Sequence, residues 1–205
     1  CPDPVKGGGR VVLQCAELSQ AKRSILGSEQ EQWLFQGLRQ SQRQWKVLGQ
    51  SSLIASTRID SPLGKTTYTD GWDGYPMTRR RLLDVVSETR LSDVVTLGGD
   101  VHMNVASVLR AESNDAQSPV LASEFVTTSI SSRGMSDTLL TAIRQSNPDL
   151  IHARSDERGY TLLEFTPKQT VAEFRTTPHP AGTSDVLKVQ ARFVVESGRA
   201  GPQTT

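Results

Sequence analysis

The stretch Val94-Val95-Thr96-Leu97-Gly98-Gly99-Asp100-Val101-His102 constrains the fold more than any other part of the chain. Its first four residues are apolar or β-branched and predict a buried strand over 94–97. The two glycines that follow would let the backbone turn tightly where the strand ends. In open α/β sheets, ligands bind beyond the carboxyl ends of the strands. We therefore expect a functional site at this turn.

Asp100 and His102 are the residues of this turn whose side chains could bind a ligand or take part in catalysis. Because they lie two residues apart, an extended backbone would place both side chains on one face. A carboxylate oxygen beside a neutral imidazole suits a divalent or trivalent metal ion. The same residues also fit an aspartate that orients a structural histidine, or an ordinary turn at a strand end. The residues alone leave these alternatives open.

Helical and strand patterns alternate in the first half of the chain, and strands dominate the second half. Ser28 and Glu31 predict a capping box at the start of the first helix. Residues 56–74 are polar, contain several glycines and a proline, and predict a long loop. The pattern is typical of a layered α/β sandwich. We predict helices over 28–42, 77–88 and 136–145, and strands over 10–15, 45–48, 94–97, 105–110, 121–129, 160–165, 170–175 and 187–195.

Length and composition indicate one globular domain. The chain has 205 residues, with 23 Lys and Arg against 22 Asp and Glu, so no net field would recruit nucleic acid or an anionic membrane. No apolar run approaches the roughly 20 residues of a transmembrane helix. We expect a flexible lead-in over 1–9, a folded domain over 10–196 and a disordered tail over 197–205.

The chain begins at Cys1 without an initiator methionine or a visible signal peptide. We therefore expect a processed protein or a piece of a longer one. A lipid anchor on Cys1 and a disulfide between Cys1 and Cys15 are both open.

Five segments, taken in this order, resemble the C-terminal part of PhoD-like alkaline phosphatases/phosphodiesterases, a branch of the calcineurin-like metallophosphoesterases. The sequences WDGYP and GDVH are the most specific of them. The segments are 26–34 with 45–49, Asp70-Gly71-Trp72-Asp73-Gly74-Tyr75-Pro76, Gly98 to His102, Glu124 to Ser132, and Asn147-Pro148 with Arg158-Gly159-Tyr160.

This resemblance implies a four-layer αββα sandwich, of which the chain is the C-terminal part. It implies hydrolysis of phosphate mono- or diesters with calcium and iron as cofactors, in a protein exported to the periplasm or beyond. Asp100 and His102 would then be metal ligands. Asp73 and Tyr75 would lie near the site, supporting the ligands or contacting the substrate, although packing of the loop is an alternative for Tyr75.

The chain departs from the family pattern in ways that leave the site incomplete. Asp149 stands where relatives often have histidine, and no counterpart of the family's upstream metal-binding motifs is visible. The chain is therefore expected to need an upstream segment or a second chain as a partner. The sequence does not identify a catalytic residue. The alternatives are a minimal enzyme that recruits His152, Asp149 or Asp156, and a non-catalytic binding or structural module without metals. We expect His179, between two prolines, in a surface loop.

Overall fold

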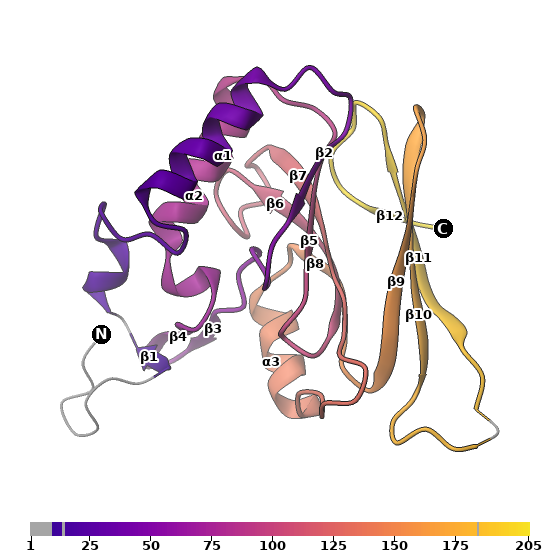
Figure 1. Ribbon diagram of the computed structural model, residues 1–205. Coiled ribbons are helices and arrows are strands. Elements are labelled where there is room, and N and C mark those ends of the chain that lie inside the picture. Colours follow the sequence, from indigo (N-terminus) through magenta and orange to yellow (C-terminus); the bar gives the residue numbers. More distant parts are fainter. Residues whose placement is uncertain (1–9, 14, 184) are drawn as a thin grey trace.

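The protein consists of a layer of helices, a five-stranded sheet and a four-stranded sheet, stacked side by side (Figure 1). The structure is a computed structural model that describes residues 10–13, 15–183 and 185–205. The three α-helices are α1 (Ser28–Gln40), α2 (Pro76–Glu88) and α3 (Asp137–Ser146), and two short 3-10 turns are η1 (Ala16–Ser19) and η2 (Trp72–Gly74).

The five-stranded sheet lies at the centre of the molecule and has the order β2-β5-β7-β6-β8. Strands β2, β5 and β7 are parallel, so their carboxyl ends meet at one edge, whereas β6 runs antiparallel to β7 and β8. The strands are β2 (Lys46–Gly49), β5 (Val94–Gly98), β6 (Asn104–Arg110), β7 (Val120–Val126) and β8 (Leu150–Arg154), the last of which the sequence did not predict.

The four-stranded sheet is antiparallel and has the order β12-β11-β10-β9. Its strands are β9 (Glu157–Phe165), β10 (Gln169–Pro178), β11 (Lys188–Glu196) and β12 (Gln203–Thr204). A third, small sheet joins β1 (Val11–Leu13), β4 (Gly64–Tyr68) and β3 (Ile59–Ser61) in that order.

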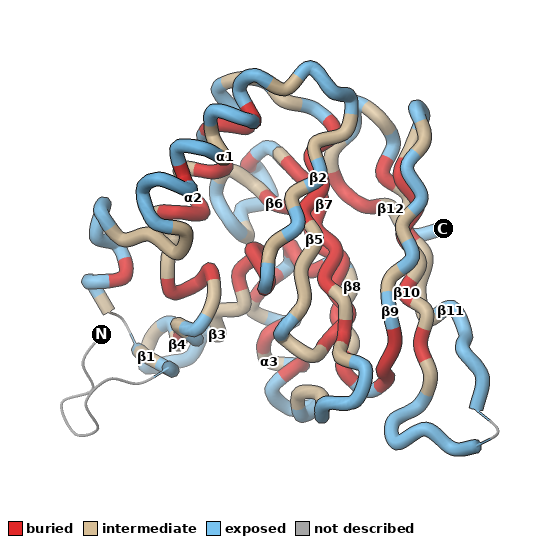
Figure 2. The backbone as a smooth tube through the Cα atoms, viewed as in Figure 1, coloured by how far each residue is buried: buried red, intermediate tan, exposed pale blue. Residues whose placement is uncertain are grey.

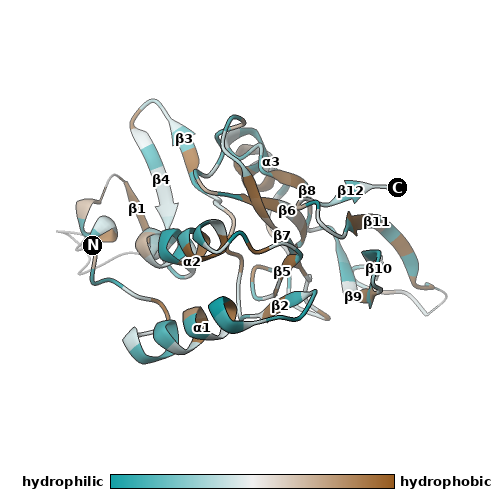
Figure 3. Ribbon diagram, turned by 90° about the horizontal axis from the view of Figure 1, so that it is seen from above, coloured by the Kyte–Doolittle hydropathy of each residue, from teal (hydrophilic) through white to brown (hydrophobic). Residues whose placement is uncertain are grey.

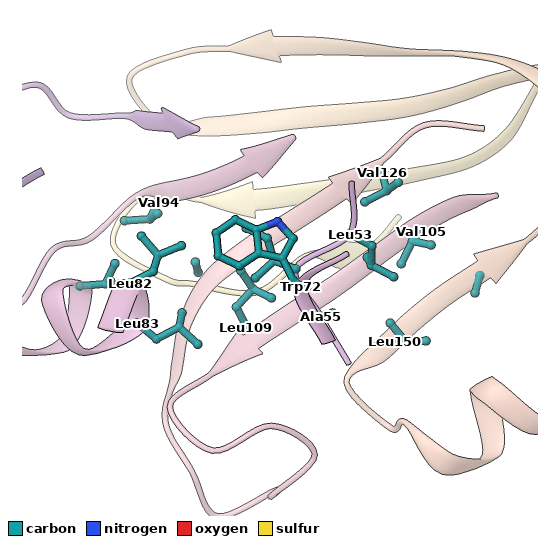
Figure 4. Close-up of a cluster of buried hydrophobic side chains, with 14 of the residues drawn as sticks. Leu53, Ala55, Trp72, Leu82, Leu83, Val94, Val105, Leu109, Val126 and Leu150 are labelled. Atoms are coloured by element: carbon teal, nitrogen blue, oxygen red, sulfur yellow. The ribbon is translucent and has the colours of Figure 1, made fainter. Parts of the chain in front are cut away.

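Alternation along the central strands gives the molecule two hydrophobic cores. Val94 packs into the core beneath the helices, while its neighbour Val95 packs into the core between the two sheets. The helix-side core includes Trp72, Leu82 and Leu83 (Figure 4). Figure 2 shows the resulting band of buried residues along the central strands.

The expected layered α/β fold is confirmed. The view from above separates α1 and α2, the central sheet and the four-stranded sheet (Figure 3). Within the described residues, no helix covers the outer face of the four-stranded sheet. None of the described helices is long and apolar enough to span a membrane.

The predicted capping box at the start of α1 is wrong. Gly27, with a φ of 81°, is the N-cap residue, and no side chain caps this helix end. The carboxylate of Glu31 instead accepts hydrogen bonds from Arg81 of α2 at 2.7 and 2.8 Å. A strong ion pair with a distant arginine thus replaces the local cap.

Two further predictions are corrected by the structure. Residues 56–74 contain the β3–β4 hairpin and η2 in place of a long loop. The tail at 197–205, expected to be disordered, packs against both sheets. Gly198 N donates to Asp93 Oδ1 at 2.6 Å, Gly201 N donates to Ser123 Oγ at 2.9 Å, and β12 pairs with β11. The lead-in at 1–9, and with it the question of a Cys1–Cys15 disulfide, lies outside the described residues.

Candidate functional site

The carboxyl ends of β2, β5 and β7 bring three loops together. Gln50 N donates to the carbonyl of Leu97 at 2.9 Å, and Thr127 N donates to the carbonyl of Gly98 at 3.0 Å. These hydrogen bonds fix the loops after β2 and β7 to the end of β5. The GDVH turn, which follows β5, lies between these two loops. This is the edge at which ligands bind in α/β sheets.

Asp100 and His102 line the same pocket, which has a volume of about 490 Å³. The extended backbone predicted for these two residues is wrong. Both residues adopt the left-handed conformation, with φ values of 66° and 55°. Neither Gly98 nor Gly99 has a positive φ, so the turn is made by the acidic and imidazole residues themselves.

A hydrogen bond fixes the imidazole ring of His102. Its Nδ1 lies 2.9 Å from the backbone oxygen of Arg133. Because a carbonyl oxygen only accepts, Nδ1 carries the proton, and in the neutral ring Nε2 keeps its lone pair. Metal-binding histidines are commonly held in this way, with the second ring nitrogen donating to a carbonyl or carboxylate. The backbone oxygen of His102 accepts from Ser155 Oγ at 3.0 Å, which holds the residue from its other side.

Asp70 also lines this pocket, whereas Asp73 is the residue of this loop that the sequence predicts near the site. Its carboxylate lies 3.5 Å from a guanidinium nitrogen of Arg10, and both side chains are exposed. Asp70 and Asp73 belong to one loop segment, and no sequence signal distinguished the two. Within the described residues, no three His, Cys, Asp or Glu side chains lie close enough together to hold a metal ion.

Asp73 is buried and positions a wall of the pocket. It accepts hydrogen bonds from Thr57 N at 2.7 Å and Thr57 Oγ1 at 3.0 Å, and it forms an ion pair with Arg79 at 2.9 Å. Thr57 lines the pocket of Asp100 and His102. Asp73 therefore reaches the site through Thr57 rather than through its own carboxylate.

Tyr75 lies away from the pocket of Asp100 and His102. It is the N-cap residue of α2, and its ring faces the guanidinium of Arg23, whose central carbon is 4.6 Å from the ring centroid. The pocket lining does not include Tyr75. Trp72, in the same loop, is buried, and its indole nitrogen donates to Gln50 Oε1 at 3.0 Å. The side chain of Trp72 therefore packs in the core.

Residues 56–60, which lead into the β3–β4 hairpin and include the start of β3, separate two pockets. Successive side chains of this extended segment point to opposite sides. Thr57 and Ile59 face the pocket of Asp100 and His102. Ser56, Arg58 and Asp60 face a second, polar pocket of about 420 Å³. The two pockets share no lining residue.

Glu124 anchors the loop that leads into this segment. Its buried carboxylate accepts from the backbone nitrogens of Ile54 at 2.7 Å and Ala55 at 2.9 Å, and from Ser107 Oγ at 2.9 Å. Burial raises the pKa of the Glu124 carboxyl above its usual value, and the backbone hydrogen bonds partly oppose that rise.

The other acidic and imidazole candidates do not join Asp100 and His102 in the pocket. Asp149 forms an ion pair with Arg110 at 2.8 Å. The ring of His152 stacks on Phe174 between the sheets, where burial lowers the pKa of the imidazole. Asp156 pairs with Arg154, and His179 lies in an exposed loop, as predicted.

Comparisons with known proteins agree with this architecture. A family model described as PhoD-like phosphatase matches residues 6–174. Alkaline phosphatase D of Bacillus subtilis strain 168 is 35% identical over an alignment of 184 positions, which covers 87% of this chain and 31% of that protein. A solved structure described as "Structure of PhoD" matches with a TM-score of 0.85 and 30% identity, over 95% of this chain and 38% of that chain.

The chain therefore spans about a third of the length of these two relatives. The sequence match includes the WDGYP and GDVH segments, and the fold match includes both sheets and the helical layer. The resemblance inferred from the five segments is confirmed: this chain belongs to the PhoD-like phosphatase family.

Proposed function

We propose that this chain supplies part of the metal-binding active site of a phosphoester hydrolase. One observation carries the proposal: Asp100 and His102 line one pocket at the carboxyl edge of the central sheet, and His102 Nδ1 is occupied by the Arg133 carbonyl. Nε2 is thereby left as the nitrogen that can bind a metal. Membership of the PhoD-like phosphatase family supports phosphoester hydrolysis as the reaction.

The donor set fits a metal ion in part. Asp100 offers a hard oxygen and His102 a neutral nitrogen, a pair that suits calcium or iron, the ions implied by the family resemblance. A bound metal ion would lower the pKa of a water molecule and offset negative charge on the phosphoryl oxygens. In this chain Arg133 orients the imidazole, while Asp73 holds Thr57 at the pocket wall.

Two protein ligands do not complete the coordination of a metal ion, because such ions bind roughly four to eight ligand atoms. We propose that an upstream segment of a longer protein, or a second chain, supplies the others. Both relatives are much longer than this chain, which covers 31% of one and 38% of the other. Like other members of the family, the complete protein would act in the periplasm or outside the cell.

An open apolar surface supports the need for a further segment. Among the described strands, β2 lies at one edge of the central sheet. Beside it, Trp33 of α1 is 72% exposed and Val47 of β2 is 45% exposed. A groove of about 440 Å³ runs between these two elements. Exposed apolar surface of this kind marks an interface.

The proposal is tested by hydrolysis of p-nitrophenyl phosphate and bis-p-nitrophenyl phosphate, which distinguish monoesters from diesters. In the complete protein, Asp100→Asn and His102→Asn should each lower kcat at least about 100-fold and reduce bound metal, measured by elemental analysis. Asp84→Asn and His179→Asn are matched controls, because both residues are exposed and lie outside the pocket.

Three results would contradict the proposal. Full turnover by Asp100→Asn would show that this pocket does not take part in the reaction. Stoichiometric metal binding and turnover by the 205-residue chain alone would remove the need for a further segment. A complete, folded protein without metal and without turnover would favour the non-catalytic module.

A further inference from the structure

The pocket that contains Asp100 and His102 has mainly apolar walls. Besides Val101 and Met103 next to His102, the apolar side chains come from the small sheet, the segment after the loop of Arg133, and α3. They are Val11, Ile59, Tyr68, Met135, Leu139 and Ile143. The polar and charged lining residues are Arg10, Thr57, Thr66, Asp70, Asp100 and His102.

Several of these apolar side chains are not covered by other described residues. Tyr68 is 45% exposed and Leu139 is 42% exposed, although both line the pocket. Ile143, in contrast, is buried and forms part of the helix-side core. The apolar wall therefore rests on the fixed core and extends outward to side chains that can still lose water on binding a ligand.

The apolar character is confined to one side of the hairpin. Ile59 pairs with Thr66 across the β3–β4 ladder and faces this pocket, whereas the neighbouring pair, Asp60 and Lys65, faces the polar pocket. A volume of about 490 Å³ lies within the usual range for small-molecule sites.

We propose that this pocket binds the apolar alcohol group of a phosphoester, with the phosphate directed toward Asp100 and His102. This inference rests on the proposed function and names its substrate class. An aryl or alkyl group would displace water from the walls formed by Tyr68, Met135 and Leu139. A polar group such as a sugar would remove less apolar surface from water against the same walls and would gain less from binding there.

The test measures binding to the metal-free 205-residue chain by ligand-observed NMR, with 1-naphthyl phosphate and methyl phosphate as probes. Because it needs neither metal nor turnover, it can fail or succeed independently of the proposed hydrolysis. We expect the naphthyl ester to bind at least about tenfold more tightly, since the two probes differ only in the alcohol group.

Substitutions locate the binding. Leu139→Ser and Tyr68→Ser should each weaken binding of 1-naphthyl phosphate roughly three- to tenfold. Leu63→Ser is the matched control, because Leu63 is also an exposed leucine near the hairpin but does not line the pocket. Both test residues are exposed, so circular dichroism should show unchanged folding.

Equal affinity for the two probes would overturn the inference, as would equal effects of Leu139→Ser and Leu63→Ser. Binding of 1-naphthyl phosphate by the isolated chain but not by the complete protein would also overturn it. That result would show that another part of the polypeptide fills the pocket. Retention of the naphthyl preference in the complete protein, with the same loss on Leu139→Ser, would support it.

Discussion

The backbone of Gly98, at the end of β5, lies against the backbone carbonyl of Ser52 in the loop that follows β2. A β-carbon on Gly98 would come well within 3.0 Å of that oxygen and of Gln50 Nε2. The glycine is therefore required for close approach of two backbones rather than for a positive φ. This contact sets the spacing between two of the loops that meet at the candidate site.

The first prediction follows from this contact. Gly98→Ala should lower the free energy of unfolding by about 1–3 kcal/mol, because backbone atoms must move apart to admit the methyl group. Gly37→Ala is the control: it lies in α1, and nothing would lie within 4 Å of its β-carbon. That substitution should stabilise the chain by about 0.5–1 kcal/mol. Urea denaturation measures both, and equal effects would contradict the prediction.

The second prediction concerns the ion pair between Glu31 and Arg81, which joins α1 to α2. The hydrogen bond from Arg81 lowers the pKa of Glu31 below its usual value of 4.5, against the opposing effect of burial. The carboxylate therefore contributes stability above pH 4.5, and this contribution disappears as the pH falls through the lowered pKa.

Glu31→Gln should accordingly cost about 1.5–3 kcal/mol at pH 7 and much less near pH 3. Glu29→Gln, on the exposed side of the same helix, should cost less than about 0.5 kcal/mol at either pH. Chemical denaturation at the two pH values provides the measurement. A loss for Glu31→Gln that does not change with pH would show that the ion pair is not the cause.

The third prediction concerns Glu124, whose buried carboxyl holds the backbone of Ile54 and Ala55. Glu124→Gln should lower the free energy of unfolding by about 1–3 kcal/mol, because the amide nitrogen would face a backbone donor. Since burial raises the pKa of Glu124, its contribution is greatest at low pH and falls as the pH rises through that raised pKa. The difference between wild type and variant should thus be larger at pH 5 than at pH 8. A larger difference at pH 8 would contradict this.

The fourth prediction tests the surface beside β2. Trp33→Asp should change the unfolding free energy of the isolated chain by less than about 0.5 kcal/mol, because the indole is exposed. In the complete protein the same substitution should cost about 3 kcal/mol or more, since it would place a charge in an apolar contact. Trp72→Phe should be destabilising in both, because Trp72 is already buried within this chain and donates a hydrogen bond to Gln50. Equal tolerance of Trp33→Asp in both proteins would remove this surface as an interface.

The sequence predicted those parts of the fold in which local pattern and packing agree. Leu82, Leu83 and Val86 recur at helical spacing in the helix predicted over 77–88, and all three are buried. The predicted strands in the second half are present, and those predicted over 160–165 and 170–175 pair with each other as β9 and β10.

Other elements escaped prediction because their partners are far away in the chain. Glu31 had the spacing of a capping box, but an arginine fifty residues later forms the stronger interaction. The β3–β4 hairpin was missed because its two strands are short and mostly polar, and Ile59 both packs against the helix-side core and lines the pocket. The order of the last nine residues depends on Asp93 and Ser123, which no local pattern could indicate.

The candidate site was predicted in its location but not in its geometry. Asp100 and His102 do share one pocket, although the shared face expected from an extended backbone is absent. Asp73 was the expected neighbour, whereas Asp70 is the one that reaches the pocket. The metal role of Asp100 and His102 stays a prediction.

The left-handed conformations of Asp100 and His102 make this turn costly to form by itself. Each such residue raises the energy of the folded chain by roughly 1–3 kcal/mol. A ligand that binds both side chains would offset that cost. It could bind both of them only when the turn is fully formed. Loading of the site should therefore slow amide hydrogen exchange most strongly at this short segment, well before it affects the surrounding sheets.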